Sequence, residues 1–497
     1  MARLIRRLLI ANRGEIAVRV IRACREMGVE SIAVYSEADA RAAHVLAADR
    51  AMPIGPAPAT QSYLSIPSII GAAQAARADA IHPGYGFLSE NAAFAAACEK
   101  AEIVFVGPPS GVIERMGSKI EARRLMQAAG VPLVPGETPT DQSDAGVRAA
   151  VDRVGLPALV KASAGGGGKG MRRVDDAGAV GAAVQAARRE AVAAFGDGTL
   201  YVERLIDRAH HVEVQIFGDS QGNVVHLFER ECSVQRRHQK VIEESPSPTM
   251  TPATRARIAD AGLRAARAAS YRNAGTVEFL VDLADGGDQA RFYFLEVNAR
   301  LQVEHPVTEQ VTGVDLVRAQ ILVASGEPLP WTQDALLQRG HAIEARVYAE
   351  DPSAGFLPQA GRLLLYREPQ LPGVRVDSGV AEGDDVPVHY DPLLAKVIAS
   401  AETRGQAIAR LVAALRAYPV LGVRTNIPFL LRVLEHARFA AGAIDTGFLD
   451  RESAGLAERA DEVMPAHVRA AIGAAEDDSA DRPGSPSRAW DPWARTS

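Results

Sequence analysis

Residues 295–304 alternate between apolar and polar side chains, and this period of two constrains the fold more than any other feature of the chain. The odd positions, from Leu295 to Val303, are apolar. Such alternation is typical of a β-strand that packs one face on a core and turns the other outward. A merely solvated face would also carry Lys, Thr and Ser, so the residues found here indicate a binding site. The polar positions are Glu296, Asn298, Arg300, Gln302 and Glu304.

A second strand-like segment, residues 275–282, precedes the first, and a turn signal surrounds Gly287. A hairpin symmetric about Gly287 places Glu278 opposite Glu296, with their Cβ atoms about 5 Å apart. Like charges in this position destabilise a hairpin unless one carboxyl is protonated or a cation lies between them. Asn298 follows on the same face. Two carboxylates and an amide oxygen suit Mg²⁺ or Mn²⁺, with phosphate oxygens as further ligands.

The polar face is too long to serve one site as a straight strand. Glu296 and Glu304 would then lie roughly 26 Å apart. We therefore expect the strand to end near Asn298 and residues 300–304 to form a loop that curls over the metal. Pro306 marks the far end of this loop, because the residue before a proline is held out of the helical region.

A glycine-rich segment at residues 162–171 follows a short apolar strand that ends at Lys161. Consecutive glycines let backbone N–H groups approach phosphate oxygens closely. The segment is not a P-loop, because Gly170 rather than Ser or Thr follows Lys169. Four glycines are also compatible with a flexible tip, but the strand patterns on both sides favour a mobile lid over phosphate.

Lysine is rare in this chain. Only six of the 55 basic residues are Lys, so a retained Lys indicates a site that needs a compact ammonium. Four of them lie in motif-like stretches, namely Lys119, Lys161, Lys169 and Lys240. Chance retention explains Lys169 and Lys396 equally well. The basic stretch that ends at Lys240 is short and lacks aromatic residues, and the net charge of −6 argues against nucleic acid as a partner. A polyphosphate fits better.

Together these motifs resemble the ATP-grasp superfamily and, within it, the biotin carboxylases. The resemblance covers about residues 1–450 and rests on Asn-Arg-Gly-Glu-Ile at 12–16, His-Pro-Gly-Tyr-Gly-Phe-Leu-Ser-Glu-Asn at 82–91, the glycine-rich segment, residues 232–240 and residues 296–308. It implies an α/β protein with an ATP-grasp fold, an N-terminal Rossmann-like (pre-ATP-grasp) domain, a small glycine-loop lid and a C-terminal α+β catalytic domain. The expected domains are residues 1–115 (N-terminal), 116–205 (linker helices and lid), 206–450 (catalytic and C-terminal) and 451–497 (an Ala-rich, partly disordered tail).

The resemblance also implies a reaction and a set of site residues. The reaction is the ATP- and bicarbonate-dependent carboxylation of biotin on a carrier protein, through carboxyphosphate. Glu278, Glu296 and Asn298 would hold Mg²⁺ or Mn²⁺. Lys240, Arg300, Gln302 and the Val303 backbone would bind bicarbonate, Glu304 would be the general base, and Arg346 would face the biotin ureido group. The implied nucleotide contacts are Lys119, Lys161, Gly165, Gly166, Gly167, Gly168, Glu203, Ile206, His211, Gln235 and His238.

The first 115 residues alternate between strand and helix patterns, which predicts a parallel sheet. Ser89 is the expected N-cap of the last helix. The expected strands are 8–11, 31–35, 79–82 and 103–106, and the expected helices are 14–28, 66–77 and 89–100. Residues 361–388 are rich in Gly, Pro and Val and predict further β-structure.

Composition bears on compartment and partners. Three isolated cysteines offer no disulfide framework or zinc spacing, which suits a reducing cytoplasm. No run approaches transmembrane length, so we expect no membrane partner. The resemblance implies a homodimer that works with a biotin carboxyl carrier protein and a carboxyltransferase subunit. No Met precedes a Lys, so the Met-Lys-Met biotinylation signature is absent: the carrier is separate, or the chain is truncated.

Several alternatives stay open from sequence alone. The final acceptor could be acetyl-, propionyl- or methylcrotonyl-CoA, and a component of a pyruvate or urea carboxylase is a further option. Another ATP-grasp ligase is a second reading, against which Arg346 and the 300–304 loop favour biotin. A non-catalytic nucleotide-sensing scaffold is a third, and the intact acidic residues Glu278, Glu296 and Glu304 argue against it.

Overall fold

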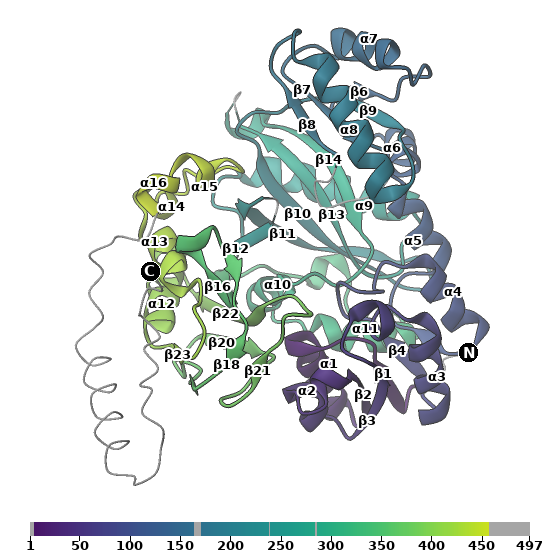
Figure 1. Ribbon diagram of the computed structural model, residues 1–497, viewed down its shortest axis with the longest axis vertical. Helices are drawn as coiled ribbons and strands as arrows, with labels where there is room; N and C mark the ends of the chain where they lie inside the picture. Colours follow the sequence, from purple (N-terminus) through teal and green to yellow (C-terminus); the bar gives the residue numbers. More distant parts are fainter. Residues whose placement is uncertain (1–3, 164–169, 238, 284–285, 457–497) are drawn as a thin grey trace, which may run out of the picture.

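The computed structural model describes residues 4–163, 170–237, 239–283 and 286–456. In Figure 1 the N-terminal unit (purple to blue) lies at the lower right, a small lid unit at the top, and one large sheet crosses the centre. The C-terminal helices (yellow-green) flank the large sheet at the left. Within the described chain, no helix combines the length and the apolar character needed to cross a bilayer.

The N-terminal unit is a parallel five-stranded sheet, as predicted. The strand order is β3-β2-β1-β4-β5, so the strand after α2 was missed by the sequence reading. The strands are β1 (Arg7–Ile10), β2 (Glu30–Ser36), β3 (Arg50–Gly55), β4 (Ala80–His82) and β5 (Val104–Phe105). The helices are α1 (Gly14–Met27), α2 (Ala43–Ala47), α3 (Ile66–Ala76) and α4 (Ala92–Lys100).

The predicted N-cap of α4 was wrong. The helix begins at Ala92, and the side chain of Asn91 caps it by accepting a hydrogen bond of 2.9 Å from the Phe94 backbone N–H. Ser89 lies in the preceding turn and is buried. Asn and Ser cap helices about equally well, so composition alone did not decide between them.

Two linker helices, α5 (Ser110–Gly117) and α6 (Lys119–Ala128), lead into the lid. The lid is an antiparallel four-stranded sheet in the order β6-β9-β7-β8, packed against two helices. Its elements are β6 (Gly136–Glu137), α7 (Asp144–Val154), β7 (Ala158–Ala162), β8 (Arg172–Val174), α8 (Val180–Phe195) and β9 (Leu200–Arg204).

The large sheet is antiparallel throughout, and it unites two regions that are far apart in sequence. In spatial order its strands are β14 (Arg291–Asn298), β13 (Asn273–Asp282), β10 (His210–Gly218), β11 (Val224–Arg236), β12 (Gln239–Ser245), β15 (His341–Tyr348), β22 (Leu393–Ala401) and β20 (Val374–Ser378). The pairing of β12 with β15 makes the C-terminal strands a continuation of the nucleotide-side sheet.

Helices pack against this sheet, and short two-stranded sheets complete the C-terminal region. The helices are α9 (Pro252–Ala268), α10 (His305–Thr312), α11 (Leu316–Ala324), α12 (Arg404–Arg416), α13 (Ile427–Glu435), α14 (Ala437–Ala440), α15 (Phe448–Arg451) and α16 (Ser453–Leu456). The two-residue strands are β16 (Glu350–Asp351), β17 (Leu357–Pro358), β18 (Gly361–Arg362), β19 (Leu365–Tyr366), β21 (Asp385–Val386) and β23 (Val420–Leu421). The β-structure predicted for residues 361–388 is therefore present. Most of the predicted 451–497 tail lies outside the described residues.

One hydrophobic cluster joins the N-terminal unit to the large sheet. Ile16 and Val20 of α1 share it with Phe217 of β10 and Leu316 of α11, and all four are buried. Burial of such side chains contributes about 1.5–3 kcal/mol each relative to exposure. The first unit is therefore fixed against the sheet, and α1 lies next to the loop that follows β14.

Candidate functional site

The β13–β14 hairpin has the predicted register. Glu278 pairs with Glu296, and Thr276 pairs with Asn298. The register shifts by one residue between Glu278 and Phe279, so the symmetric pairing holds only on the side away from the turn. The strand ends at Asn298, as expected, and the next helix begins only at His305.

Glu278 lies at the centre of a dense polar cluster. Its Oε2 is 2.8 Å from His211 Nε2, and its Oε1 is 2.9 Å from Lys240 Nζ. Asn298 and Gln302 donate side-chain hydrogen bonds of 2.8 and 3.2 Å to the same Oε1. Burial alone would raise the pKa of Glu278, but Lys240 and His211 outweigh it and hold that pKa well below its ordinary value. Glu278 is therefore ionised.

Glu296, across the hairpin, behaves in the opposite way. Burial, reinforced by the charges of Glu278 and Glu90, raises its pKa, and the nearby Lys119 only partly opposes this. A carboxyl held in the field of another carboxylate is the arrangement that a divalent cation relieves. The donors here are hard oxygens from Glu278, Glu296 and Asn298, so the residues present fit Mg²⁺ or Mn²⁺.

The loop after β14 folds back, as predicted. Arg300 Nε donates 2.9 Å to Glu90 Oε2, and its two terminal nitrogens donate to Gln302 Oε1 at 3.0 Å and to Asn298 Oδ1 at 3.2 Å. Glu90 also accepts a bond of 2.9 Å from the Ala299 backbone N–H. Glu90 therefore ties this loop to the N-terminal unit. Glu90 belongs to the 82–91 motif, but the sequence alone predicts no role for it.

Lys240 joins three acidic side chains. Its Nζ lies 2.5 Å from Glu213 Oε2, 2.9 Å from Glu278 Oε1 and 2.6 Å from Glu304 Oε1. Burial would lower the pKa of Lys240, but these carboxylates raise it well above its ordinary value. The ammonium is therefore charged, and it links the predicted metal ligands on one side to the predicted base on the other.

Glu304 is fully buried and paired with two cations. Oε1 meets Lys240, and Oε2 accepts a hydrogen bond of 3.0 Å from Arg346. Burial would raise the pKa of Glu304, but Lys240, Arg346 and Arg230 lower it well below its ordinary value. Arg346 in turn donates 2.6 Å to Glu243 Oε1, from β12. Five of the predicted catalytic and bicarbonate side chains thus lie in one contiguous network with Glu278, namely Lys240, Arg300, Gln302, Glu304 and Arg346.

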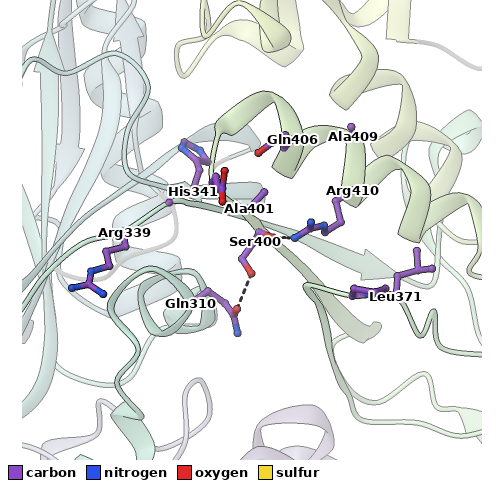
Figure 2. Close-up of a pocket in the computed structure, with 12 residues that line it drawn as sticks. Gln310, Arg339, His341, Leu371, Ser400, Ala401, Gln406, Ala409 and Arg410 are labelled. Carbon is purple, nitrogen blue, oxygen red and sulfur yellow. Dashed lines mark hydrogen bonds between the residues drawn. The ribbon is translucent and has the colours of Figure 1, made fainter.

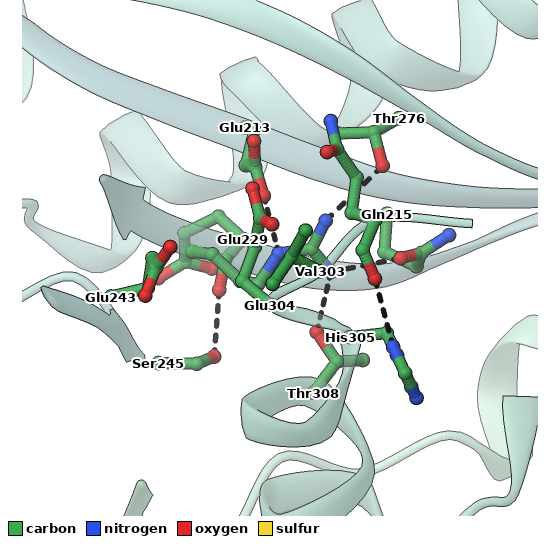
Figure 3. Close-up of polar contacts among 12 residues, drawn as sticks. Glu213, Gln215, Glu229, Glu243, Ser245, Thr276, Val303, Glu304, His305 and Thr308 are labelled. Atoms are coloured by element: carbon green, nitrogen blue, oxygen red, sulfur yellow. Dashed lines mark hydrogen bonds and ion pairs between the residues drawn. The ribbon is translucent and has the colours of Figure 1, made fainter. Parts of the chain in front are cut away.

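A layer of buried residues beneath this network was missed by the sequence reading. Arg230 is fully buried, and it donates to Glu213 Oε1 at 2.5 Å. Figure 3 labels four of its partners, Glu213, Gln215, Thr276 and Thr308. Apart from Glu213, these lie at 2.8 Å for Gln215, 2.9 Å for Thr308 and 3.1 Å for Thr276. The alternation of β10 places Glu213 and Gln215 on one face of that strand, but the strands that become its neighbours are not visible locally.

Two groups of side chains could in principle hold a metal in this region. They are His211, Glu213 and Glu278, and Glu213, Cys232 and Glu304, each with ligand atoms within 4.8 Å of one another. The ammonium of Lys240 already supplies the positive charge to three of these carboxylates. Burial holds the pKa of Cys232 well above its ordinary value, so it is a thiol rather than a thiolate ligand. Neither group includes Glu296.

Of the predicted nucleotide residues, His211 contacts Glu278, and Lys119 lies near Glu296. Lys119 lies at the start of α6, and burial together with Lys161 lowers its pKa, while Glu296 and Glu203 oppose this. Lys161 forms a buried ion pair with Glu203 across β7 and β9. Arg123, missed from sequence, lies 4.0 Å from Glu203. Among the other predicted contacts, Ile206 follows β9, His211 lies on β10 and Gln235 on β11. Gly165, Gly166, Gly167, Gly168, Lys169 and His238 lie outside the described residues.

A separate surface groove of about 1140 Å³ opens on the C-terminal side of the large sheet. Figure 2 shows Gln310, Ser400 and Arg410 among the residues that line it, with Ser400 donating 3.0 Å to Gln310. None of the predicted site residues lines this groove. The polar network described above therefore lies apart from this groove.

The sequence matches three family descriptions in succession. They are "Biotin carboxylase, N-terminal domain" over residues 4–113, "Carbamoyl-phosphate synthase L chain, ATP binding domain" over residues 118–332 and "Biotin carboxylase C-terminal domain" over residues 344–451. Biotin carboxylase 2 of Bacillus subtilis is 49% identical over 444 residues, which are 89% of this chain and 98% of that protein. The chain belongs to the biotin carboxylase family. The predicted family, its ATP-grasp fold and its class of ATP-dependent ligase are thereby confirmed.

Two further relatives extend the comparison. The mitochondrial methylcrotonoyl-CoA carboxylase subunit alpha of Rattus norvegicus is 50% identical over 446 residues, 90% of this chain, but the match spans only 62% of that subunit. The biotin carboxylase domain dimer of the Hydrogenobacter thermophilus 2-oxoglutarate carboxylase has a TM-score of 0.87 and 41% identity, covering 92% of this chain and 100% of that domain. That biotin carboxylase structure is a complex with magnesium ADP, ADP and bicarbonate.

Proposed function

We propose that this chain carboxylates biotin carried on a biotin carboxyl carrier protein, using ATP and bicarbonate. The contact of one buried ammonium, Lys240, with both Glu278 and Glu304 carries this proposal. It brings the metal-side carboxylate, an anion-binding cation and a base to one point. Arg346 on the other oxygen of Glu304 adds a cation for the biotin ureido oxygen.

On the nucleotide side, Lys119, Lys161 and His211 would bind the phosphates of ATP. Gly165–Gly168, Glu203, Ile206, Gln235 and His238 are the further proposed nucleotide residues. Glu278, Glu296 and Asn298 would hold Mg²⁺ or Mn²⁺, which when bound screens the charge of the transferring phosphoryl group. Positioning and charge stabilisation are the main contributions that a protein makes to phosphoryl transfer.

Bicarbonate would enter between Lys240, Arg300, Gln302 and the Val303 backbone, where Glu304 removes its proton. A base works best when its pKa lies near the working pH. Burial would raise the pKa of Glu304, but Lys240 and Arg346 outweigh burial and lower this pKa well below its ordinary value. Bicarbonate would compete for these cations. When bicarbonate draws Lys240 and Arg346 partly away from Glu304, the pKa of Glu304 rises. Glu304 therefore becomes a stronger base once its substrate is bound.

The reaction then proceeds in two stages, formation of carboxyphosphate and transfer of its CO₂ to biotin. A bicarbonate oxygen attacks the γ-phosphorus of ATP, the bond to the bridging oxygen breaks, and ADP and carboxyphosphate result. Carboxyphosphate releases CO₂ and phosphate, the phosphate takes the ureido N–H proton of biotin, and the nitrogen attacks CO₂. Arg346 would stabilise the enolate-like ureido oxygen during this step, as a fixed cation does for any developing oxyanion.

Partners and compartment are part of the proposal. We expect a homodimer, supported by the dimeric relative of known structure, and a separate carrier and carboxyltransferase. Methylcrotonoyl-CoA and pyruvate are candidate final acceptors, since components of both carboxylases match at 50% identity; acetyl-CoA, propionyl-CoA and urea are the alternatives. Cys24, Cys98 and Cys232 are unpaired and buried, which supports a reducing compartment such as the cytoplasm.

The test is ADP release with Mg-ATP and bicarbonate, with and without free biotin. The proposal predicts ADP release that depends on bicarbonate and is stimulated by biotin. Bicarbonate-dependent release that is indifferent both to biotin and to a biotinylated carrier would instead indicate another ATP-grasp ligase. ATP binding without turnover would indicate a nucleotide-sensing scaffold.

A further inference from the structure

Lys396 lies on β22, far in sequence from the residues discussed above, and its side chain is fully buried. Its Nζ donates a hydrogen bond of 2.8 Å to the backbone carbonyl of Val303. The same Nζ lies 3.2 Å from Glu15 Oε1 and 3.9 Å from Asp377 Oδ2. A buried Lys needs such partners, because an unpaired charge in the interior is costly.

The accepting carbonyl belongs to the loop between Gln302 and Glu304. Gln302 is anchored at one end by Glu278, and Glu304 at the other by Lys240 and Arg346. Between these two anchors, Val303 is held through its backbone by Lys396. The Val303 carbonyl belongs to the peptide unit that leads directly into Glu304, so its orientation sets the direction from which the Glu304 side chain starts.

The ammonium of Lys396, on a C-terminal strand, contacts both the N-terminal unit and the loop after β14. Glu15 comes from the first turn of α1, in the N-terminal unit. The hydroxyl of Tyr85, from the same unit, hydrogen-bonds to Glu15 Oε1, and the Tyr85 ring centroid lies 5.9 Å from Lys396 Nζ. The N-terminal unit, the loop after β14 and a C-terminal strand therefore meet at one charged group.

We propose that Lys396 is a positioning residue for bicarbonate use, acting through its hydrogen bond to the Val303 carbonyl, with Glu15 as its counter-ion. This inference rests on the proposed function. It differs from a purely structural ion pair in one respect: loss of the ammonium would disturb bicarbonate use and proton removal while leaving the nucleotide residues in place. Lys119, Lys161 and His211 make none of the described contacts of Lys396.

The variants are chosen to separate this role from folding. Lys396→Met alone leaves Glu15 buried without its counter-ion, which threatens the fold. The double variant Glu15→Gln/Lys396→Met removes both charges and keeps the side-chain volumes similar. Glu15→Gln alone retains the donor to Val303. Lys100→Met, at an exposed lysine on α4, is the matched control.

The measurements are KM for bicarbonate, KM for Mg-ATP, kcat and the thermal midpoint of each variant. For the double variant we expect kcat/KM for bicarbonate to fall about tenfold or more, since a hydrogen bond from a charged group is lost. KM for Mg-ATP stays within about twofold of the wild-type value by the same scale. Glu15→Gln shows a smaller loss, and Lys100→Met behaves as wild type.

Three results would overturn the inference. One is a folded double variant with wild-type use of bicarbonate, and another is a Glu15→Gln variant as impaired as the double variant. The third is a double variant that fails to fold, which would make the pair structural. Turnover of the wild-type chain distinguishes failure of this inference from failure of the proposed function. If the wild-type chain lacks bicarbonate-dependent, biotin-stimulated turnover, the proposed function itself is contradicted.

Discussion

Glu278 and Glu296 face each other across one β-hairpin, yet the pKa of Glu278 is lowered and that of Glu296 is raised. The difference has a clear cause. Both are buried, but Lys240 and His211 contact Glu278, whereas Glu296 feels the negative charge of Glu278. The charge of Glu278 is thus balanced by Lys240 and His211. Glu296 lies in the field of another carboxylate, which a bound cation would relieve.

We expect Glu296→Ala to weaken binding of magnesium nucleotide by at least about tenfold, because one of the hard oxygen donors is lost. Titration calorimetry with ADP in the presence and absence of Mg²⁺ checks this. The loss should appear only when Mg²⁺ is present. Glu114→Ala, at an exposed position on α5, serves as the control. Equal affinity for magnesium ADP in the Glu296 variant would refute the metal assignment.

Glu304→Gln should preserve Mg-ATP binding and lose turnover, with kcat falling about 10²- to 10⁴-fold, as is usual when a general base is removed. The isosteric amide still accepts from Lys240 or Arg346, so the fold should persist. Bicarbonate-dependent ADP release and a separate nucleotide titration measure the two effects. Glu114→Gln is the matched control. Normal turnover would show that another group takes the bicarbonate proton.

Arg230 and Glu213 form an ion pair in which both side chains are fully buried. Removing one member leaves the other as an uncompensated charge, so Arg230→Met should lower the free energy of unfolding by about 3–5 kcal/mol. The double variant Glu213→Gln/Arg230→Met should recover part of that loss. Urea denaturation of the two single variants and the double variant gives the coupling energy. Strict additivity would mean that the pair does not interact energetically.

Two buried histidines predict a pH dependence of stability. Burial lowers the pKa of His44 and of His82 to about 4. Unfolding restores an ordinary pKa of about 6.5, so the unfolded chain binds more protons below that pH and stability falls as pH drops from 6.5 towards 4. The expected loss between pH 7.5 and 5.5 is about 1.4 kcal/mol per histidine.

Urea denaturation at those two pH values measures this loss. His82→Gln should show a weaker pH dependence by one histidine's share, although its stability at pH 7.5 also changes, because His82 contacts Gln320 and the Gly84 backbone N–H. His389→Gln, at an exposed histidine, serves as the matched control. An unaltered slope in the His82 variant would show that this group does not supply the effect.

The sequence predicted local geometry well and assembly poorly. The register of Glu278 and Glu296 followed from alternation and one turn, and the end of the strand at Asn298 followed from the reach of a straight chain. The bulge after Glu278 was missed, because nothing in the residue types requires it. Glu213 and Arg230 were missed because their importance depends on which strands become neighbours.

The importance of Lys396 also depends on strand pairing that the sequence does not reveal. Its rarity among 49 arginines was noticed, but chance retention stayed an equal explanation. Only the pairing of β15 with β22 and of β22 with β20 brings it to Val303. A residue that acts through another residue's backbone leaves no motif around itself.

The reach of Lys396 has a consequence for the order in which the chain matures on the ribosome. Its hydrogen bond to Val303 joins residues 93 positions apart. The β13–β14 hairpin, Lys119 of α6 and the lid strands are synthesised before β22, so the proposed nucleotide residues are present before β22 emerges. The Val303 carbonyl gains its hydrogen bond from Lys396 only when β22 joins the sheet. If these residues have the proposed roles, the chain would become competent to activate bicarbonate, and to spend ATP doing so, only after the C-terminal strands have joined the sheet.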